Sequence, residues 1–555
     1  MDSRVRDLVQ IGDALFSQRN DLMSYWQELA NNFYPERADF TLKRSDGDHW
    51  SGLMSSEPVR VRQELANVIQ SMLRPASGDW FNIHVMDDIV DHDREARVWL
   101  EYMTRTQRRA MFHTPAQFER ATKEADNDWV TFGMAPMSVD IHPNYTHLIY
   151  RTGHLKDHAW TEDYAGQVDT MHCRWELTAR QLSKLFPVTI HTRITDMLRD
   201  EPNKMVRCRR IVLPRDDYDM DRAKLRGTNA NWISIYIDID NEKVLEERPI
   251  MWMPYIVPRW QRVSGSQYAW SPCTGPGLAD ARTLQAVVRT LLEAGEKAVD
   301  PPLVATQDVV RSDINVYAGG VTWVDELYDE RLGDALRPLT QDMRGLPIGL
   351  EMADRFRNVL TEGFFLNKLS IPEMGDRATA YETRKRVEEH IRQSVPLLSP
   401  AESEYNDPLC QKTFEVLVAM KAFGSVENIP QVLRGQQTRY EFKSPIKEMS
   451  EELKGQKLLE AFGILDPAAK IDPAQLKQLD LDVAVRDSLQ GINVPSRWLS
   501  REGTVARYRQ QLEQQAQVAA GLEGTMASAQ AVEQVGRAGM AMQQLEAPNG
   551  SAAQG

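Results

Sequence analysis

The sequence predicts an α+β protein that is mainly helical. In several long stretches apolar residues recur at three- and four-residue steps, which is the spacing of one face of a helix. Between residues 137 and 260 the pattern changes to alternating runs such as 232–237, which indicate strands. A chain of 555 residues is also long enough to form more than one domain.

Residues 1–272 are predicted to contain N-terminal helices and a mixed region of helix and sheet. A long amphipathic helix is expected over 3–33, because its apolar residues share one face and Pro35 ends it. A further helix is expected over 118–130, and a short one at 177–185 inside the sheet region. This part of the chain therefore combines both kinds of secondary structure.

Two helical runs around an irregular middle dominate the centre of the chain. The first, over 273–300, follows a Gly-Pro-Gly turn and stops before Pro301. The second, over 346–368, has Pro347 in its first turn. Residues 301–345 between them contain a glycine pair and short apolar pieces, which predict a small β-rich or irregular excursion. The apolar stripes of the two runs are Leu278, Leu284, Val287, Val288, Leu291 and Leu292 in the first and Leu350, Ala353, Phe356, Leu360 and Phe364 in the second.

The chain after residue 368 alternates between polar and helical segments. Residues 369–378 contain proline and glycine, and a Thr-Ala-Tyr-Glu capping box then starts a helix in the segment 379–444. Residues 445–510 are predicted to be helical again, with Asp-Pro pairs at two helix starts. The last segment, 511–555, is rich in glutamine and alanine, which predicts a partly disordered tail.

Net charge, cysteine spacing and hydropathy indicate which partners and which cellular compartment the sequence favours. The net charge is -14, whereas DNA-reading domains are usually basic. An acidic wall nevertheless suits a conduit for a polyanion, because it repels phosphate and avoids tight binding; many ordinary soluble proteins are also acidic. The four cysteines are scattered without a C-x-x-C pair, which argues against a disulfide framework and a zinc site. Without an 18-residue apolar run or a signal-peptide core, we expect a soluble protein, neither secreted nor membrane-spanning.

The search for catalytic motifs finds little. The sequence has no G-x-x-x-x-G-K-[ST] phosphate loop and no G-x-S-x-G nucleophile elbow. His154 and His158 share a helical spacing but lack the glutamate of HExxH, and Asp238 and Asp240 lack a further ligand at a defined spacing. We therefore expect no catalytic residue, no metal and no cofactor. The alternative that stays open is a metal-dependent enzyme of nucleic-acid metabolism, for example a nuclease that uses Asp238 and Asp240.

The central region resembles a known family. A Gly-Pro-Gly turn leads into a helix that ends in Ala-Val-Asp-Pro-Pro-Leu, and the excursion carries Gly-Gly and Leu-Arg-Pro-Leu. A Leu-Pro-Ile-Gly-Leu-Glu-Met helix follows and ends in Phe-Phe-Leu. This order is similar to the portal, or head-to-tail connector, of short-tailed, T7-like bacteriophages. The resemblance covers roughly residues 26–509 and is most specific over 273–368.

The resemblance implies a portal fold that assembles as a ring of twelve copies. The implied parts are the wing at 1–272 and 379–444, the stem helices at 273–300 and 346–368, the clip at 301–345, the tunnel loop at 369–378 and the crown at 445–510.

The implied function is a channel at one capsid vertex for DNA packaging and ejection, which docks terminase and then tail proteins. The protein would be part of the virion, at the portal vertex, after assembly in the host cytoplasm. An internal virion structural protein is the remaining alternative. The implied partners are further copies of the chain in a homododecamer, double-stranded DNA in the channel, the terminase large subunit, tail adaptor and nozzle proteins, major capsid and scaffolding proteins, and internal core proteins.

Three groups of residues are candidates for these roles. Lys368 and Arg377, at the two ends of the tunnel loop, are basic in an acidic protein; the resemblance implies that they contact DNA phosphates, and ordinary salt bridges are the alternative. In the clip, Val321, Trp323 and Val324 are too few for a core of their own, so they pair with neighbouring copies or a partner protein, or pack on their own stem. The charged stem residues that either face the channel or form ordinary solvated surface are Arg289, Glu293, Glu296, Lys297, Glu351, Asp354 and Arg355.

Overall fold

The structure is a computed structural model in which the chain forms two compact units. The first comprises Met1–Asp91 and Trp99–Glu451, and the second His92–Val98 and Glu452–Gly555. The residues that the structure describes are 3–42, 49–50, 52–76, 78–218, 230–299, 303–305, 336–338, 345–369, 389, 392–393, 399–443, 461, 463, 483–485, 488–489, 494, 498, 507–512 and 514–515.

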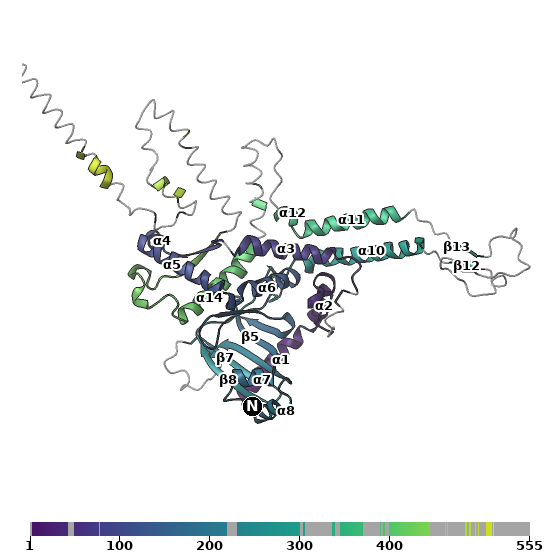
Figure 1. The fold of residues 1–555 in the computed structure, drawn as a ribbon, viewed down its shortest axis with the longest axis horizontal. Helices are drawn as coiled ribbons and strands as arrows, with labels where there is room; N and C mark the ends of the chain where they lie inside the picture. Colours follow the sequence, from purple (N-terminus) through teal and green to yellow (C-terminus); the bar gives the residue numbers. More distant parts are fainter. Residues whose placement is uncertain are drawn as a thin grey trace, which may run out of the picture. The chain divides into compact units, whose positions relative to one another are not determined.

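The described residues form both helices and sheets, which agrees with the predicted α+β class (Figure 1). Among the described residues, no helix combines the length and the apolar character that crossing a bilayer requires. The helices are α1 (Ser3–Gln18), α2 (Asn20–Phe33), α3 (Glu57–Leu73), α4 (Asp88–His92), α5 (Arg94–Met111), α6 (Phe118–Phe132), α7 (Ala179–Leu185), α8 (Thr192–Asp200), α10 (Leu278–Val299), α11 (Leu346–Gly363), α12 (Leu366–Leu369) and α14 (Asp407–Ala419).

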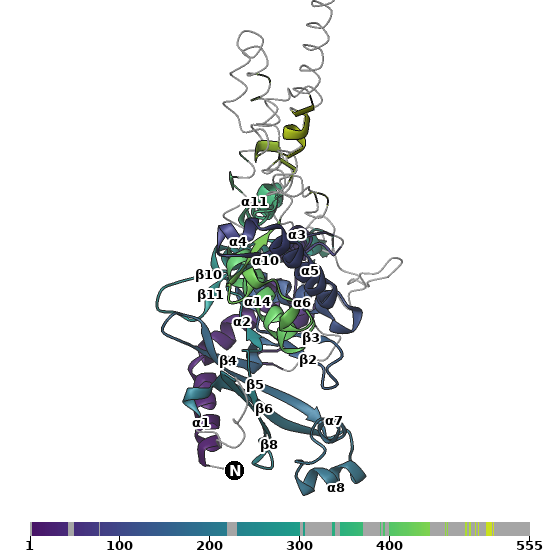
Figure 2. The same ribbon diagram turned by 90° about the vertical axis from the view of Figure 1, so that its left-hand side faces the viewer.

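The largest sheet has five antiparallel strands in the order β4-β5-β6-β7-β8. Successive side chains of a strand point to opposite faces, and both faces of this sheet are covered. One face packs Ile211 and Ile235 against Val5 of α1, and the other packs Val206 against Leu182 of α7 and Ile194 of α8. Figure 2 shows α1 on one side of the sheet and α7 and α8 on the other. The strands are β4 (His158–Glu162), β5 (Val168–Thr178), β6 (Met205–Pro214), β7 (Trp232–Asp238) and β8 (Lys243–Ile250).

Smaller sheets connect distant parts of the first unit. In one of them, strand β14 pairs with β1 so that Phe442 lies opposite Phe81, which joins residues near the end of the unit to its beginning. Trp80, next to this pair, is fully buried and stacks on Phe442 with ring centroids 6.2 Å apart. The strands are β1 (Phe81–Val85) with β14 (Thr438–Phe442), β2 (Met137–Ile141) between β3 (Leu148–Thr152) and β9 (Tyr255–Ile256), β10 (Gln261–Arg262) with β11 (Ala269–Trp270), and β12 (Leu303–Ala305) with β13 (Leu336–Pro338).

Several predicted helices are present, with ends that differ from the predicted ones by a few residues. Helix α10 covers the residues that the apolar spacing indicates, and α6 ends at Gly133, whose left-handed φ of 79° stops the helix. Helix α7 begins with a capping box in which Thr178 and Gln181 exchange hydrogen bonds. These elements share strong local end signals in the sequence.

The single helix expected over 3–33 is wrong, because the chain breaks at Arg19 into α1 and α2. The Arg19 side chain is buried and donates hydrogen bonds to the carbonyl oxygens of Leu155 (2.9 Å), Lys156 and His158. These contacts fix the guanidinium in the turn before β4, more than 130 residues away in sequence. The apolar face of α1 is displaced as well, since Ile11 is exposed while Val5 and Phe16 are buried.

The second central helix is also interrupted. The prediction places one helix over 346–368, but α11 ends at Gly363 and the short α12 starts at Leu366. Phe365 between them has a left-handed φ of 59°, a conformation that is uncommon for residues other than glycine. The interruption separates Lys368 from the straight part of the helix pair.

Candidate functional site

Helices α10 and α11 pack side by side and extend away from the five-stranded sheet (Figure 1). At ~1.5 Å per residue, the 22 residues of α10 span roughly 33 Å. The two helices approach closely at Gly349, where an added Cβ would lie 2.7 Å from Cδ2 of Leu291. A Cβ at position 349 would therefore require the Leu291 side chain to shift, and glycine leaves room for that side chain between the helices.

The base of the helix pair is fixed by aromatic and backbone packing. Before α10 the chain makes a π-helical turn, Cys273–Gly277, in which Cys273 and Thr274 are buried. An added Cβ at Gly277 would lie 2.4 Å from the carbonyl oxygen of Pro272, so only glycine fits this turn. Phe364, at the end of α11, is completely buried and packs on Phe33 of α2 with ring centroids 5.7 Å apart.

Polar contacts brace the first turns of α10 against the N-terminal region. The side-chain oxygen of Gln285 accepts hydrogen bonds from the backbone N–H groups of Met54 (2.8 Å) and Ser55 (2.9 Å), and its amide donates to the Ser55 carbonyl. Both carboxylate oxygens of Glu28 in α2 accept from the Arg282 guanidinium at 2.5 Å. These hydrogen bonds raise the pKa of Arg282. The start of α10 is thus held by two other segments of the same chain.

Full burial along the pair is concentrated toward the base, and Ala353 in the middle of α11 is the exception. In α10 the buried residues are Leu278, Ala281 and Leu284, all within its first two turns, and in α11 they are Ala353 and Leu360. Two residues of the predicted apolar stripes, Leu292 and Leu350, are 52% and 54% exposed. The exposed apolar side chains of the pair are Leu292, Val299, Ile348, Leu350, Met352 and Val359.

These exposed apolar residues include sites that sequence reasoning missed. The chain itself leaves them without cover in the described residues, and soluble monomers rarely expose many large apolar groups along one element. The available signal was the presence of apolar residues off the main stripe, such as Ile348 and Met352 beside Leu350. A helix with apolar groups on more than one face indicates partners on more than one side.

The charged candidates on the two helices are solvent-exposed, as both readings of their role require. Asp354 pairs with Arg357 one turn later at 2.6 Å, and such exposed pairs are worth little on their own. Acidic and basic groups are nearly equal in number along the pair. The acidic side chains are Asp280, Glu293, Glu296, Glu351, Asp354 and Glu362, and the basic ones are Arg282, Arg289, Lys297, Arg355 and Arg357.

The other candidates are only partly covered by the structure. Lys368 is exposed on α12, with its ammonium nitrogen 5.7 Å from the ring centroid of Phe365. Arg377 lies outside the described residues, and so do the three apolar candidates between α10 and α11, Val321, Trp323 and Val324. Of the expected excursion at 301–345, the structure describes the pairing of β12 with β13, in which Val304 lies opposite Arg337.

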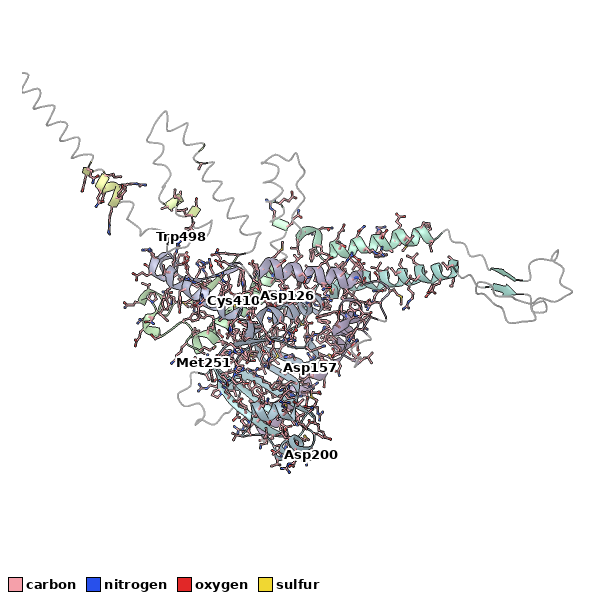
Figure 3. The ribbon with its side chains drawn as sticks, in the orientation of Figure 1. Asp126, Asp157, Asp200, Met251, Cys410 and Trp498 are labelled. Carbon is pink, nitrogen blue, oxygen red and sulfur yellow. The ribbon has the colours of Figure 1, made fainter. Side chains whose placement is uncertain are left out.

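A buried ion pair links α3 and α6 next to residues 405 and 406. Arg74, at the end of α3, pairs with Asp126 of α6, and their side chains are 1% and 0% exposed. The same guanidinium donates to Oδ1 of Asn406 at 2.7 Å and lies over the Tyr405 ring. Figure 3 shows Asp126 in the interior of the helical part. Burial raises the pKa of Asp126 more than the guanidinium lowers it.

The residues considered for an enzyme site have structural partners. The buried carboxylate of Asp238 accepts hydrogen bonds from the backbone and side chain of Asn241, which closes the β7–β8 turn. Asp240 pairs with Arg207 at 2.7 Å. His154 Nε2 lies 2.5 Å from Oδ1 of Asp39. Each of these groups is thus engaged by a partner within its own chain.

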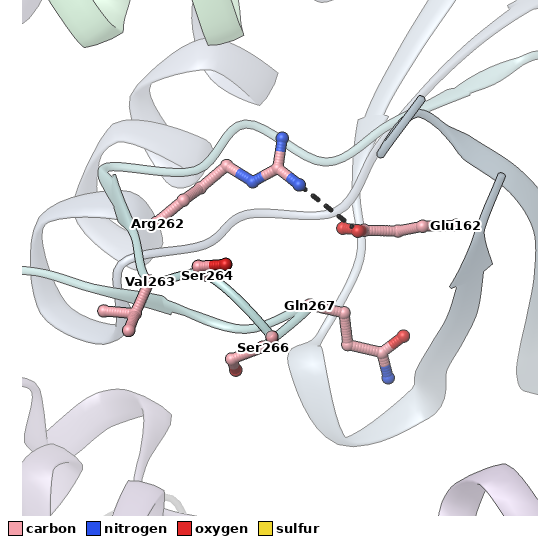
Figure 4. A pocket seen from close by; sticks show the side chains of 7 residues that line it. Glu162, Arg262, Val263, Ser264, Ser266 and Gln267 are labelled. Atoms are coloured by element: carbon pink, nitrogen blue, oxygen red, sulfur yellow. Dashed lines mark hydrogen bonds and ion pairs between the residues drawn. The ribbon is translucent and has the colours of Figure 1, made fainter. Parts of the chain in front are cut away.

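One surface hollow of about 500 Å³ lies beside the β10–β11 hairpin. Its lining includes Arg262, Ser264, Ser266 and Gln267, and Figure 4 shows Arg262 bonded to Glu162 across it. The charged groups of the hollow therefore satisfy one another, and no nucleophile–base pair is formed by these lining residues.

The helix pair carries large apolar side chains that the described part of its own chain leaves exposed. The model of the family described as bacteriophage head to tail connecting protein matches residues 6–499, and the chain belongs to this family. The chain is 24% identical over 477 residues to the probable portal protein of Bordetella phage BPP-1, which covers 84% of each chain. It is 21% identical over 529 residues to the portal protein of Salmonella phage epsilon15, covering 93% of this chain and 92% of that one. The function is that of a phage portal protein, as the sequence resemblance implies.

Proposed function

We propose that the chain forms a closed ring of about twelve copies at one capsid vertex, with α10 and α11 as the stem around a channel for double-stranded DNA. In this arrangement the residues at 301–345 form the clip, the segment 369–378 is the tunnel loop and the region 445–510 is the crown. The sheet of β4 to β8 with its covering helices belongs to the outer wing. The protein is a virion component without catalytic residues of its own.

The observation that carries the proposal is the exposed apolar surface of the helix pair. Leu292, Leu350 and Met352 lie on helices that contribute little to the core of their own chain beyond the base. Burying such side chains against neighbouring copies stabilises the ring by about 25 cal/mol per Å² of apolar surface. In a ring, contacts between neighbouring helix pairs would bury these side chains, so each pair does not need a hydrophobic core of its own.

The partners follow from the same arrangement. DNA passes through the ring during packaging and ejection, terminase docks at the clip end during packaging, and tail adaptor and nozzle proteins replace it afterwards. Capsid, scaffolding and internal core proteins contact the outer and inner parts of the ring. Lys368 and Arg377 contribute loose phosphate contacts near the tunnel loop, and the clip residues Val321, Trp323 and Val324 pair between copies or with a docked partner.

The test is native mass spectrometry of the purified protein, with a substitution on the helix pair and a matched control. Parent protein should form closed rings of about twelve copies. Met352→Glu should shift the population to smaller species, because a charge then replaces an apolar contact between copies. Val188→Glu, an equally drastic change at a site that is 91% exposed outside the pair, should leave the rings intact. A parent protein that stays monomeric at micromolar concentration under all salt conditions overturns the proposal.

A further inference from the structure

Helix α5 carries an exposed basic surface in a chain whose net charge is -14. Tyr102, which is 39% exposed, is followed by exposed Arg105 and Arg109 at three- and four-residue steps, so the three side chains share one face. Arg108 beside them pairs with Asp79, whereas Arg105 and Arg109 pair with no carboxylate in the described part of the chain. We call Tyr102, Arg105 and Arg109 the basic patch.

The segment that leads from β1 into α4 has the opposite charge and also exposes apolar side chains. Met86 is 63% and Ile89 is 85% exposed, and Asp87 and Asp88 between them are exposed as well. Oδ1 of Asp87 accepts a hydrogen bond from the N–H of Ile89 at 3.0 Å, which fixes this turn. Asp88 lies 3.9 Å from the Arg439 guanidinium, and an exposed contact of this kind is worth little. Residues 86–89 are the acidic patch.

The two patches are too far apart to neutralise each other within one chain. Strand β1 runs antiparallel to α5, since Asp79 pairs with Arg108 and the N–H of Ile83 donates to Oγ1 of Thr104 at 3.0 Å. At ~3.3 Å per residue, Asp87 is therefore roughly 13 Å from the level of Thr104, toward the start of α5. The basic patch extends from Thr104 toward the end of α5. The separation exceeds the Debye length of ~8 Å at physiological salt.

The patches nevertheless match each other in chemistry. Each combines two like charges with at least one exposed apolar or aromatic side chain, and the signs of the charges are opposite. Aromatic and arginine side chains are enriched where proteins contact one another. In a ring, every copy presents one surface to the preceding copy and a different surface to the following one. Two complementary patches at different places on one chain are what such a head-to-tail contact requires.

We propose that the acidic patch of one copy docks on the basic patch of the next copy, with the two aspartates against the two arginines and Ile89 against Tyr102. The inference rests on the ring of the proposed function and adds a specific contact between its copies. This contact is separate from the helix pair, because α4 and α5 lie on the other side of the first unit from the outer ends of α10 and α11 (Figure 1).

Disulfide trapping between two single-cysteine variants tests the contact directly. The four native cysteines are buried, so introduced surface thiols react selectively. Ile89→Cys and Tyr102→Cys copies are coexpressed, and the purified rings are oxidised. Mass spectrometry should then find linked dimers that contain one copy of each variant. Rings made of either variant alone should give no linked dimer.

A coexpressed pair of Ile89→Cys with Leu185→Cys is the matched control, since Leu185 is 44% exposed on α7, outside both patches. It should give no linked dimer. Dimers of Ile89→Cys with itself would mean that two acidic patches meet, which overturns the head-to-tail contact. Rings that form but never link Ile89→Cys to Tyr102→Cys overturn this inference and leave the ring standing. A parent protein without rings overturns the proposed function instead.

Reversing the charges gives an independent test. Arg105→Glu/Arg109→Glu alone and Asp87→Lys/Asp88→Lys alone should each lower the yield of rings at low salt by about tenfold or more, because like charges then face each other. Coexpression should restore the parent yield, in rings that contain equal numbers of the two variants by native mass spectrometry. Each acidic surface then meets a basic one again. Parent yields from the separate variants, or no recovery on coexpression, would refute the pairing.

Two further variants separate the contact from folding and from overall charge. Asp88→Lys with Arg105→Glu copies repeats the exchange without removing the hydrogen bond between Asp87 and Ile89. Arg180→Glu/Arg193→Glu makes the same change of charge at exposed sites on α7 and α8 and should leave the ring yield unchanged.

The basic patch has one rival occupant, the phosphate backbone of DNA. In that case Arg105→Glu/Arg109→Glu would keep the parent yield of rings and lower the amount of packaged DNA. That result would overturn the contact between copies and assign the basic patch to nucleic acid.

Discussion

Replacing Arg74 with methionine should destabilise the folded chain strongly. The substitution leaves the carboxylate of Asp126 buried without a counter-charge, and both side chains are essentially inaccessible to solvent. Removing one partner of such a pair costs ~3–5 kcal/mol. The lost hydrogen bond to Asn406 falls within the same network, so we do not add it separately. Solvent screening, which weakens exposed pairs, does not reduce the effect at a site buried this deeply.

The loss should depend on pH in a defined direction. Burial raises the pKa of Asp126 above 3.8 even in the presence of Arg74, so the folded chain holds this proton more tightly than the unfolded chain. Stability from this group is therefore greatest below the unfolded pKa and falls as pH rises through the folded pKa. Without the guanidinium the folded pKa rises further, and the deficit of Arg74→Met should be larger at about pH 8 than at about pH 5.

Urea unfolding followed by tryptophan fluorescence measures both effects, since Trp129 packs on Tyr405 beside the pair. The control is the double variant Arg74→Met/Asp126→Leu, which removes both charges and should recover most of the stability, because apolar replacement of a buried pair is close to neutral. A single variant within about 1 kcal/mol of the parent at about pH 8 would refute the reasoning. So would a double variant no more stable than the single one.

Four further outcomes follow from the described contacts. Leu284→Ala should lower the free energy of unfolding by ~2–5 kcal/mol, measured by urea titration, because the side chain is completely buried. Val288→Pro should cost ~3 kcal/mol or more by breaking α10, and a melting curve by circular dichroism equal to the parent's would show the helix assignment to be wrong. Lys368→Glu with Arg377→Glu should impair DNA packaging or retention while rings still assemble; full retention contradicts the channel role. Burial lowers the pKa of His84, but hydrogen bonds to its two carboxylate partners outweigh this and raise it. Its stabilising contribution is therefore fully present below the unfolded pKa and lost as pH rises through the folded one, and the pH dependence of the urea midpoint should flatten in His84→Gln.

Elements with strong signals in their own sequence were predictable. Helix α10 has a glycine turn before it and two prolines after it, so its bounds depend on neighbouring residues alone. The capping box at Thr178 marks α7 in the same way. In such cases local stereochemistry and tertiary packing favour the same structure.

The breaks could not be predicted because their causes are distant or lack a sequence signal. The break at Arg19 depends on carbonyl groups at residues 155–158, which no local pattern reveals. The left-handed Phe365 has a residue type that gives no turn signal. The exposure of Leu292 and Leu350 was also beyond the sequence, because apolar spacing shows which residues share a face but not whether that face is covered by its own chain.

The nearly equal numbers of acidic and basic groups on α10 and α11 have a consequence for transport. Alternating signs a few ångströms apart produce fields that cancel within about a Debye length, ~8 Å at physiological salt. Under the proposed arrangement, a phosphate backbone sliding past this wall meets neither a deep well nor a high barrier. The energy landscape along the stem is then flat, so movement of the duplex should be insensitive to base sequence and only weakly dependent on salt. Resistance to movement of the DNA would then arise mainly outside the helix pair, where acidic and basic side chains do not balance.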